Sequence, residues 1–465
     1  MNTYARQPVA FVRGEGVWLW DESGRKYLDA LAGIAVNTLG YGHPRLTEAL
    51  LRRIQSGVLH TSNLWRIPDQ EAAADRIAEI TGLDEVFFCN SGLEATEASI
   101  KVARKYGHDR GVAEPAIIVM EKAFHGRSLA TLSATGSRKV QAGFEPLVSG
   151  FVRVPLNDLE AVHQVAENNR NVVAVLIEPI QGEGGINVSR LEYLRGLKEI
   201  CDRREWLFIS DEVQCGLGRT GKWFVYQHAG LLPDVVALAK GLASGVPIGA
   251  CIVGGRAKGV FKPGNHGSTF GGNPLATTAA VTTIDTIREE RLLENAAKVG
   301  EVIRSGLTGA PGAVEVRGMG LMIGVEMERP CGELVKAALD AGLVLNVTAE
   351  NVVRMLPPLV MDEAFPATDG MEYLEQLHAR MPADVPVRLT RLEGRPVPFL
   401  VRHVASTTPW LVRPSTTAYG VNRLRSASNV SHASRAGSHT SRWLAVQISS
   451  IFAVPACQLS GKTLG

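Results

Sequence analysis

The chain has 465 residues, 45% of them hydrophobic and 21% charged, and a formal net charge of +2. Its length exceeds that of one ordinary domain, and its composition is that of a soluble globular protein. The first residues carry charge without an apolar signal segment, and no apolar run is long enough to span a membrane. The six cysteines lack the spacing of a zinc site or a disulfide framework, so we expect a cytoplasmic protein with reduced thiols and no bound metal.

Short strands and one helix are predicted in the first 60 residues. Residues 10–32 alternate apolar and polar side chains around a turn at 21–24, as β-strands do. After Pro44, apolar residues recur with the period of a helix. The apolar face of this helix is formed by Leu46, Leu50, Leu51 and Ile54.

From residue 70 to about 285, short apolar runs alternate with helical segments. The strand candidates are 86–88, 116–120, 172–177, 207–209 and 235–238. Runs that are apolar throughout are typical of a mostly parallel sheet covered by helices on both faces, so the predicted fold class is α/β. One long helix over 280–298 is then expected to lead into a smaller α+β region, with strands near 322–325 and 344–347.

These patterns divide the chain into four parts. Residues 61–280 are expected to form a large domain, and residues 281–384 a smaller domain that includes the N-terminal segment 1–60. The last part, 385–465, contains ten Lys and Arg against one acid, is rich in Ser, and lacks both periodicities. We expect this basic tail to be disordered, without the aromatic pattern that specific nucleic-acid recognition needs.

Four loops that follow apolar runs carry polar residues suited to chemistry, and open α/β sheets bind their ligands at such loops. In the first loop, 89–104, Ser91 and Glu94 have the form of a capping box at a helix start. The same helix start could bind a phosphate through its free N–H groups. In the second loop, Phe124 could cover a flat ring and Arg127 could bind a carboxylate, or the two could be a core and a surface residue.

The other two loops place charged groups at the ends of buried strands. Asp211 and Glu212 follow the run 206–209, where an acid often serves only as a turn residue. Lys240 follows the run 235–239, and a lysine there is costly to bury unless it is paired or neutralised. An imine with an aldehyde would remove that charge, and a desolvated lysine is the nucleophile that such chemistry needs.

Nine stretches, in this order, resemble the class III, fold-type I pyridoxal-phosphate aminotransferases. They are LDALAGIAVNTLGYGHP (28–44), LHTSNLW (59–65), NSGLEATEASIK (90–101), AFHGR (123–127), EPIQGEGG (178–185), DEVQCGLGRTG (211–221), LAKGLA (238–243), NHGSTFGGNP (265–274) and VVRMLPPL (352–359). The resemblance covers about residues 10–362, and the spacing from Asp211 to Lys240 agrees with it. It implies pyridoxal 5′-phosphate as the cofactor and a homodimer with shared active sites.

Carried over residue by residue, the resemblance implies the cofactor contacts. Lys240 is expected to bond to the cofactor aldehyde and to move the substrate proton, while Asp211 pairs with the ring nitrogen and keeps it protonated. Glu212 points the other way along the extended chain, and a structural salt bridge is expected for it. The remaining contacts are expected from Ser91, Gly92 and Leu93 at the phosphate, Phe124 and Val213 on the ring faces, Gln214 at the ring hydroxyl, and Thr269 of the partner subunit.

The resemblance also implies how substrates are recognised. Arg127 is expected to bind the α-carboxylate of an acylated diamine or the side-chain carboxylate of glutamate, and Arg354 the α-carboxylate of glutamate. Glu183 would mask Arg354 while an ω-amino substrate is bound, unless it is only a turn residue in its Gly-rich loop. Ser268 completes the expected set of substrate-binding residues.

Departures from the family pattern bear on the substrate. The resemblance implies that ornithine aminotransferases have, at the position of Gly33, a tyrosine that contacts the free α-amino group of their substrate. A glycine at this position favours an N-acylated donor. Leu93 and Thr96 replace a smaller residue and an asparagine, and backbone phosphate contacts should tolerate both changes. The expected reaction transfers the 5-amino group of N2-acetylornithine to 2-oxoglutarate in arginine biosynthesis, with succinyl-diaminopimelate as a plausible second donor.

Other activities stay open at this point. Succinylornithine, ornithine and 4-aminobutyrate are alternative amino donors. A different class of function is a catalytically inactive protein of this fold whose basic tail binds a partner, although the intact Lys240 and Asp211 argue against it. Neither a specific nucleic-acid partner nor a membrane is expected.

Overall fold

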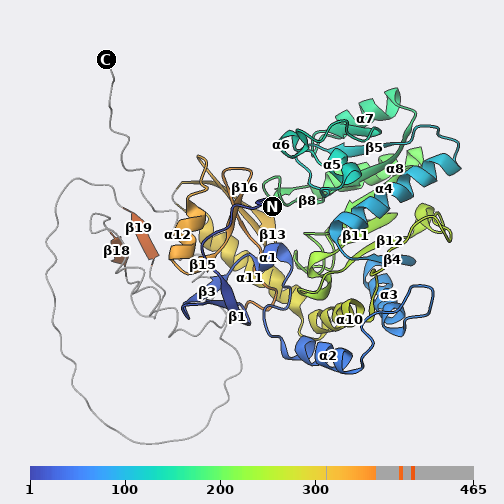
Figure 1. Ribbon diagram of the computed structural model, residues 1–465. Helices are drawn as coiled ribbons and strands as arrows, with labels where there is room; N and C mark the ends of the chain where they lie inside the picture. The colour runs from blue at the N-terminus through green and yellow to red at the C-terminus, as the bar shows by residue number, and fades with distance from the viewer. Residues whose placement is uncertain (311, 363–386, 391–399, 404–465) are drawn as a thin grey trace, which may run out of the picture.

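The computed structural model describes residues 1–310 and 312–362 together with β18 (Val387–Thr390) and β19 (Leu400–His403). Figure 1 shows a larger body around a seven-stranded sheet and, beside it, a smaller body with two four-stranded sheets. Within 385–465, β18 and β19 pair antiparallel, and the rest of this segment lies outside the described residues. Its expected disorder therefore stays a prediction.

The seven-stranded sheet is mostly parallel, as the sequence predicts. Its strand order is β4 (Glu85–Cys89), β12 (Gly249–Val253), β11 (Val235–Leu238), β10 (Leu207–Asp211), β7 (Val172–Ile177), β5 (Ala116–Met120) and β6 (Phe151–Val154). Of these seven strands, only β12 runs antiparallel to its neighbours. The sequence missed β6, a half-exposed edge strand, and β12, which begins in a stretch whose Gly and Pro indicate a loop.

Helices cover both faces of this sheet because successive side chains of a strand point to opposite sides. Along β5, Ile117 and Val119 pack against α4, whereas Ile118 and Met120 pack into the core beneath α7 and α8. The helices are α4 (Gly92–Asp109), α7 (Leu159–Asn168) and α8 (Leu191–Arg204). The strands are therefore inaccessible along their length, and a ligand can reach the sheet at the strand ends.

The smaller body holds two four-stranded sheets. One has the order β1 (Phe11–Glu15), β2 (Trp18–Asp21), β3 (Lys26–Asp29) and β15 (Leu343–Val344), with β3 and β15 parallel. The other has the order β13 (Ala313–Met319), β14 (Met322–Met327), β17 (Val352–Met355) and β16 (Asn346–Thr348). Further elements, from both bodies, are α1 (Ala32–Ala35), α3 (Pro68–Thr81), α5 (Leu129–Ala134), α6 (Arg138–Gln141), α9 (Tyr226–Ala229), α12 (Leu334–Asp340), β8 (Ile180–Gln181) and β9 (Asn187–Val188).

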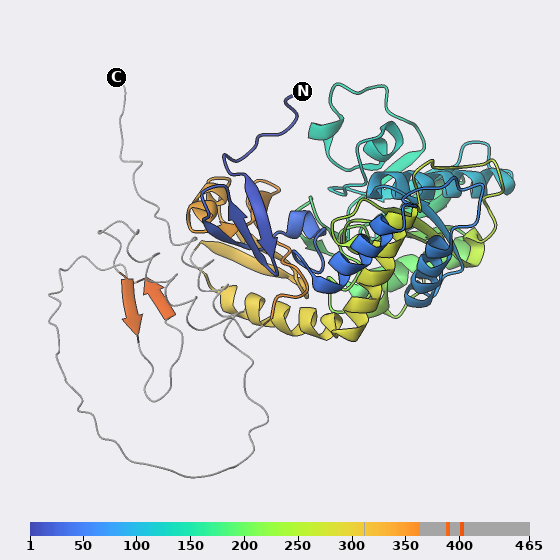
Figure 2. The ribbon, with the colours of Figure 1, turned by 60° about the horizontal axis from the view of Figure 1, so that its bottom comes forward.

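The prediction of one long helix over 280–298 is wrong, because two helices meet there. They are α10 (Pro274–Glu289) and α11 (Leu292–Leu307). Between them Arg291 has a φ of 54°, and a left-handed residue interrupts a right-handed helix. Apolar periodicity does not reveal this break, since the charged run 288–291 carries no core residue. Figure 2 shows the two helices along one side of the molecule, with α11 beside the smaller sheets.

Only part of the predicted apolar face of α2 (Pro44–Gln55) is covered. Leu46 is buried, whereas Leu51 and Ile54 are each 52% exposed. Half of this face therefore has no partner within the described chain. No helix in the described ranges is both long and apolar enough to cross a lipid bilayer.

Close backbone contact between α11 and the β13–β14 turn predicts a strong effect of one methyl group. A Cβ on Gly300 would lie 2.0 Å from the Gly320 carbonyl oxygen, so Gly300→Ala must push the helix away from the turn. We expect the free energy of unfolding to fall by about 3 kcal/mol despite the better helix propensity of alanine. Urea unfolding measures this, with Gly332→Ala as the control, because nothing lies within 4 Å of a Cβ at Gly332. Equal losses in the two variants would contradict the packing argument.

Candidate active site

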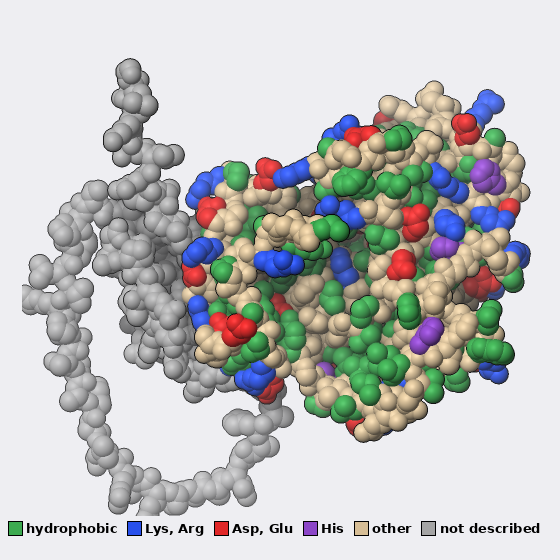
Figure 3. Space-filling view, in the orientation of Figure 1, with side chains coloured by type: hydrophobic (Ala, Val, Ile, Leu, Met, Phe, Trp, Pro, Cys, Tyr) green, Lys and Arg blue, Asp and Glu red, His purple; other side chains and the backbone are tan. Residues whose placement is uncertain are grey.

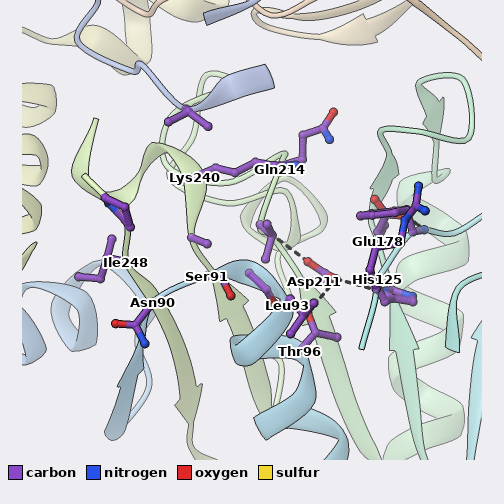
Figure 4. A pocket seen from close by; sticks show the side chains of 18 of the residues that line it. Asn90, Ser91, Leu93, Thr96, His125, Glu178, Asp211, Gln214, Lys240 and Ile248 are labelled. Atoms are coloured by element: carbon purple, nitrogen blue, oxygen red, sulfur yellow. Dashed lines mark hydrogen bonds and ion pairs between the residues drawn. The ribbon is translucent and has the colours of Figure 1, made fainter. Parts of the chain in front are cut away.

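A cavity of about 410 Å³ opens where β4, β5, β7, β10 and β11 end (Figure 4). Nine of the predicted site residues line it: Ser91, Gly92, Leu93, Phe124, Arg127, Asp211, Val213, Gln214 and Lys240. The sequence did not predict the other lining residues, which are Val36, Asn90, Thr96, His125, Gly126, Glu178, Ala239, Gly245, Val246, Pro247 and Ile248. Motifs that are distant in the sequence therefore meet around one space.

Lys240 lies directly beyond β11 and opens a 3₁₀ turn, Lys240–Ala243. Its φ of 41° is unusual for a residue other than glycine, and such backbone strain is found mostly at functional sites. Burial, together with the positive charge of Arg354, lowers the pKa of Lys240. A larger share of the amine is therefore neutral, as a nucleophile requires.

Asp211 is held at the end of β10 by groups from three elements. Its Oδ2 accepts a hydrogen bond from His125 Nδ1 at 2.8 Å and lies 3.4 Å from Thr96 Oγ1, and its Oδ1 accepts one from the Val213 N–H at 3.1 Å. Figure 4 shows Asp211 between Thr96 and His125, while Lys240 extends toward Gln214. The amine and the carboxylate therefore line the same cavity.

Glu212 does not form the predicted salt bridge with any described residue. It is fully buried, and its Oε1 accepts hydrogen bonds from the N–H groups of Val225 at 2.9 Å and Tyr226 at 3.2 Å. Its Oε2 accepts one from Cys215 Sγ at 3.1 Å. Strand alternation correctly points Glu212 away from the cavity, but it cannot reveal that backbone N–H groups replace a cation there. Burial raises the pKa of Glu212 to about 7.

The N-terminus of α4 has the features of both predictions for its motif, a capping box and free N–H groups that suit an anion. Ser91 Oγ accepts the Glu94 N–H at 3.2 Å and donates to Glu94 Oε2 at 2.9 Å, so the helix is capped. The first N–H groups of a helix have no partner within it, which leaves those of Gly92 and Leu93 beside the cavity. A Cβ on Gly92 would lie 2.5 Å from Val213 Cγ1, so only glycine lets the helix start approach Val213. This end of the cavity suits an anion.

Arg354 and Glu183 lie behind the cavity wall. Arg354, on β17, is fully buried and donates from Nη1 to Glu183 Oε1 at 2.6 Å and to Gln214 Oε1 at 3.1 Å. Its Nη2 is buried and finds no partner among the described residues. Because Gln214 lines the cavity, the guanidinium lies one side chain away from it. The unused donor suits a carboxylate brought into the cavity.

Ser268 and Thr269 do not line the cavity of their own chain. Ser268 Oγ accepts hydrogen bonds from Asn90 Nδ2 at 3.3 Å and from the Gly271 N–H at 3.0 Å. Thr269 is exposed on the same loop. The role predicted for Thr269 involves a second subunit, so it stays a prediction.

Gly33 belongs to a left-handed turn beside the cavity. Four successive residues, 32–35, have φ between 50° and 68°, and the turn leads into Val36 in the cavity wall. Gly33 itself does not line the cavity, and its φ of 63° would strain a tyrosine. Asp29 Oδ1 holds the turn by accepting the N–H groups of Leu31 and Ala32 at 2.8 and 2.9 Å.

The comparison with known families decides the identity of this fold and cavity. A family model described as aminotransferase class-III matches residues 2–377. The chain belongs to the class III aminotransferases. It is therefore a transferase that depends on pyridoxal phosphate, as the sequence predicts.

Individual relatives agree with this family. The chain is 58% identical over 368 residues to the acetylornithine aminotransferase of Nitrosomonas europaea, which covers 78% of this chain and 93% of that protein. The crystal structure of acetylornithine aminotransferase from Elizabethkingia anophelis has a TM-score of 0.71 and 35% identity, covering 81% of this chain and 95% of that one. The ornithine aminotransferase of Toxoplasma gondii has a TM-score of 0.75 and 32% identity, covering 82% and 93%.

The cavity fits pyridoxal phosphate in shape and in chemistry. Its volume lies in the range of small-molecule sites, and the first N–H groups of α4, at Gly92 and Leu93, give one end of it the chemistry of an anion site. The residues present would hold the phosphate at the start of α4, the ring between Phe124 and Val213, and the ring nitrogen at Asp211. Lys240 would hold the aldehyde carbon.

Two polar residues that line the cavity, Glu178 and His125, were not predicted although the sequence carries a signal for each. Glu178 follows a buried strand directly, as Asp211 does, and it lines the cavity. His125 stands between Phe124 and Arg127 in a stretch that was already singled out. Its Nδ1 bonds to Asp211, and its buried Nε2 finds no partner among the described residues. The rule that selected Asp211, an acid at the end of a buried strand, would also have selected Glu178.

The buried carboxyl of Glu212 predicts a dependence of stability on pH. Because folding raises its pKa from 4.5 to about 7, the folded chain binds this proton more tightly than the unfolded chain. The resulting stability is fully present below about pH 4.5 and is lost as the pH rises through about 7. Glu212→Gln keeps an oxygen for both N–H groups and should avoid a loss on the order of 3 kcal/mol between pH 5 and 8. Urea unfolding of both proteins at the two pH values measures this, and equal losses would contradict the prediction.

Proposed function

We propose that this enzyme is an acetylornithine aminotransferase. It transfers the 5-amino group of N2-acetylornithine to 2-oxoglutarate, which gives N-acetylglutamate 5-semialdehyde and glutamate, a step of arginine biosynthesis. The structural observation that carries the proposal is the ion pair between the buried Arg354 and the partly exposed Glu183, behind Gln214. The acyl group of the donor is supported by the names of the relatives with 45 to 58% identity.

The Arg354–Glu183 pair lets one cavity accept two kinds of substrate. While the ω-amino donor is bound, Glu183 neutralises Arg354 at 2.6 Å, so that no second carboxylate is attracted. Glutamate brings an α-carboxylate that replaces Glu183, and the unused Nη2 of Arg354 provides the second donor of a bidentate contact. Arg127, in the cavity wall, binds the carboxylate at the other end of either substrate.

The remaining residues orient the reacting groups and move the proton. When bound, pyridoxal phosphate supplies an aldehyde for the amino group and a cationic ring that accepts electrons. Asp211, fixed by His125 and the Val213 N–H, keeps the ring nitrogen protonated. The Lys240 amine, whose pKa burial lowers, would take the proton from the substrate carbon that bears the amino group and return it to the cofactor.

A second candidate donor is free ornithine, favoured by the likeness to the ornithine aminotransferase of Toxoplasma gondii. Gly33, whose φ of 63° a tyrosine would adopt only with strain, takes the place of the tyrosine expected in ornithine aminotransferases, so a free α-amino group would lack that partner. Succinyl-diaminopimelate, which is also an acylated amino acid, is a plausible second donor of the proposed enzyme.

Half-reactions with single amino donors test the proposed substrate. We expect N2-acetylornithine to bleach the visible absorbance of the bound cofactor faster than ornithine or 4-aminobutyrate does, because Gly33 replaces the tyrosine that the resemblance assigns to a free α-amino group. Stopped-flow absorbance measures the rates, and Lys240→Ala, which lacks the amine that moves the proton, should not respond. Faster bleaching by ornithine or 4-aminobutyrate would refute the assignment.

We also propose that the enzyme is a cytoplasmic homodimer. The large apolar side chains that are more than half exposed include Leu51, Ile54, Leu64, Trp65 and Phe270, with exposed fractions of 52 to 86%. Figure 3 shows apolar side chains gathered over α2 and α10. An exposed apolar surface of this kind is typical of an interface. In the dimer, the exposed Thr269 beside Phe270 would reach the phosphate end of the cavity in the second subunit.

Charges on the uncovered face of α2 should separate the subunits. Leu51→Glu combined with Ile54→Glu places two carboxylates in the proposed interface, where their desolvation is costly. We expect size-exclusion chromatography with light scattering to show a monomer with little activity. Leu232→Glu, at an apolar position that is 49% exposed on another loop, should remain a dimer. A dimeric double variant would exclude α2 from the interface.

A further inference from the structure

Glu178 joins two loops at the cavity. It follows β7 directly, lines the cavity, and is only 5% exposed. Its Oε2 accepts the N–H of Phe124 at 2.6 Å, in the loop after β5. Its Oε1 accepts the N–H of Gly182 at 3.3 Å, in the loop that carries Glu183. Each carboxylate oxygen therefore holds a different loop.

Glu178 forms no ion pair with a Lys or Arg in the described part of the chain. Burial raises its pKa to about 7, although the nearby His125 acts in the opposite direction. A buried carboxyl without a cationic partner is costly, and two backbone N–H groups offset only part of that cost. Its place in the cavity wall points to a role in the site rather than to a contribution to stability.

The second loop connects Glu178 to the guanidinium of Arg354. Gly182 packs so tightly against Gln214 that a Cβ would lie 2.2 Å from Gln214 Oε1. That oxygen accepts from Arg354 Nη1 at 3.1 Å, and Glu183, the next residue, accepts from the same nitrogen at 2.6 Å. The position of Gly182 therefore fixes both acceptors of Arg354 Nη1.

We propose that Glu178 is a positioning residue that ties the loop of Phe124 to the loop of Glu183 and keeps the Arg354–Glu183 pair closed while the amino donor is bound. This inference rests on the proposed function of that pair. A second tie between the same loops, from Gln181 Nε2 to the Glu121 carbonyl oxygen at 2.7 Å, lies outside the cavity lining. Loss of Glu178 should therefore loosen the loops without unfolding them.

Two variants of Glu178 and one matched control test this role. Glu178→Gln keeps one acceptor oxygen but replaces the other with an NH₂ group, which cannot accept a hydrogen bond. One of the two hydrogen bonds, from the N–H of Phe124 or of Gly182, is therefore lost. Glu178→Asp keeps both acceptors on a shorter side chain. Glu212→Gln is the control, because this buried acid holds both its N–H groups through one oxygen and does not line the cavity.

Hydrogen–deuterium exchange of the cofactor-free proteins measures directly how well the Phe124 and Gly182 N–H groups are protected by their hydrogen bonds to Glu178. In Glu178→Gln we expect about tenfold faster exchange in the peptide whose N–H group loses its acceptor, 121–128 or 180–186, which is the effect of one lost hydrogen bond to a charged group. In Glu212→Gln both peptides should exchange as in the wild type. Wild-type exchange in Glu178→Gln would overturn the proposal.

Half-reactions measure the consequence for substrates. In Glu178→Gln, kcat/KM for N2-acetylornithine should fall about tenfold relative to kcat/KM for glutamate, and Glu178→Asp should restore part of this ratio. If the ratio of kcat/KM for N2-acetylornithine to kcat/KM for glutamate stays within about twofold of the wild-type ratio, the proposal is overturned. If the wild type does not react with N2-acetylornithine, the proposed function fails. Hydrogen–deuterium exchange still tests whether Glu178 holds the two loops. If Glu178→Gln does not fold, Glu178→Ala, which removes both acceptors, replaces it, and wild-type exchange together with a wild-type ratio in that variant would overturn the role.

Discussion

A lysine amine at the end of a buried strand loses the solvation of its charged form, and the site is arranged around this cost. Burial lowers the pKa of Lys240, and the positive charge of Arg354 acts in the same direction. Three acids, Glu183, Glu178 and Asp211, act the other way and limit the shift. The amine is thus available as a nucleophile in a cavity that still attracts carboxylate substrates through its arginines.

The acids of the site are held mainly by backbone N–H groups and not by cations. Glu178 and Glu212 each receive two backbone N–H groups, and Asp211 receives one together with the His125 ring. Such partners fix a carboxylate in place without neutralising it. Of these acids, only Glu183 takes part in an ion pair with an arginine. The Arg354–Glu183 pair is therefore the one in which a substrate carboxylate can replace the protein's own carboxylate.

Sequence patterns predict the parts of this structure that local chemistry determines. All-apolar runs predicted five of the seven strands of the large sheet, and the residues predicted in the loops after those runs are nine of the 20 residues that line the cavity. The patterns failed where the decisive partner is distant in the sequence or belongs to the backbone. The N–H groups that hold Glu212 come from residues 225 and 226, and the break at Arg291 has no apolar signal. Exposure of Leu51 and Ile54 likewise depends on what covers α2, which periodicity does not report.

The parallel pairing of β3 with β15 has a consequence for the order of folding. Leu28 is the register partner of Leu343, so the edge formed by β1, β2 and β3 stays open until nearly the whole described chain has left the ribosome. Contacts between such distant residues form late and slowly, and an open strand edge can pair with other chains in the meantime. Completion of the smaller body therefore removes the open edge of β3 from the nascent chain.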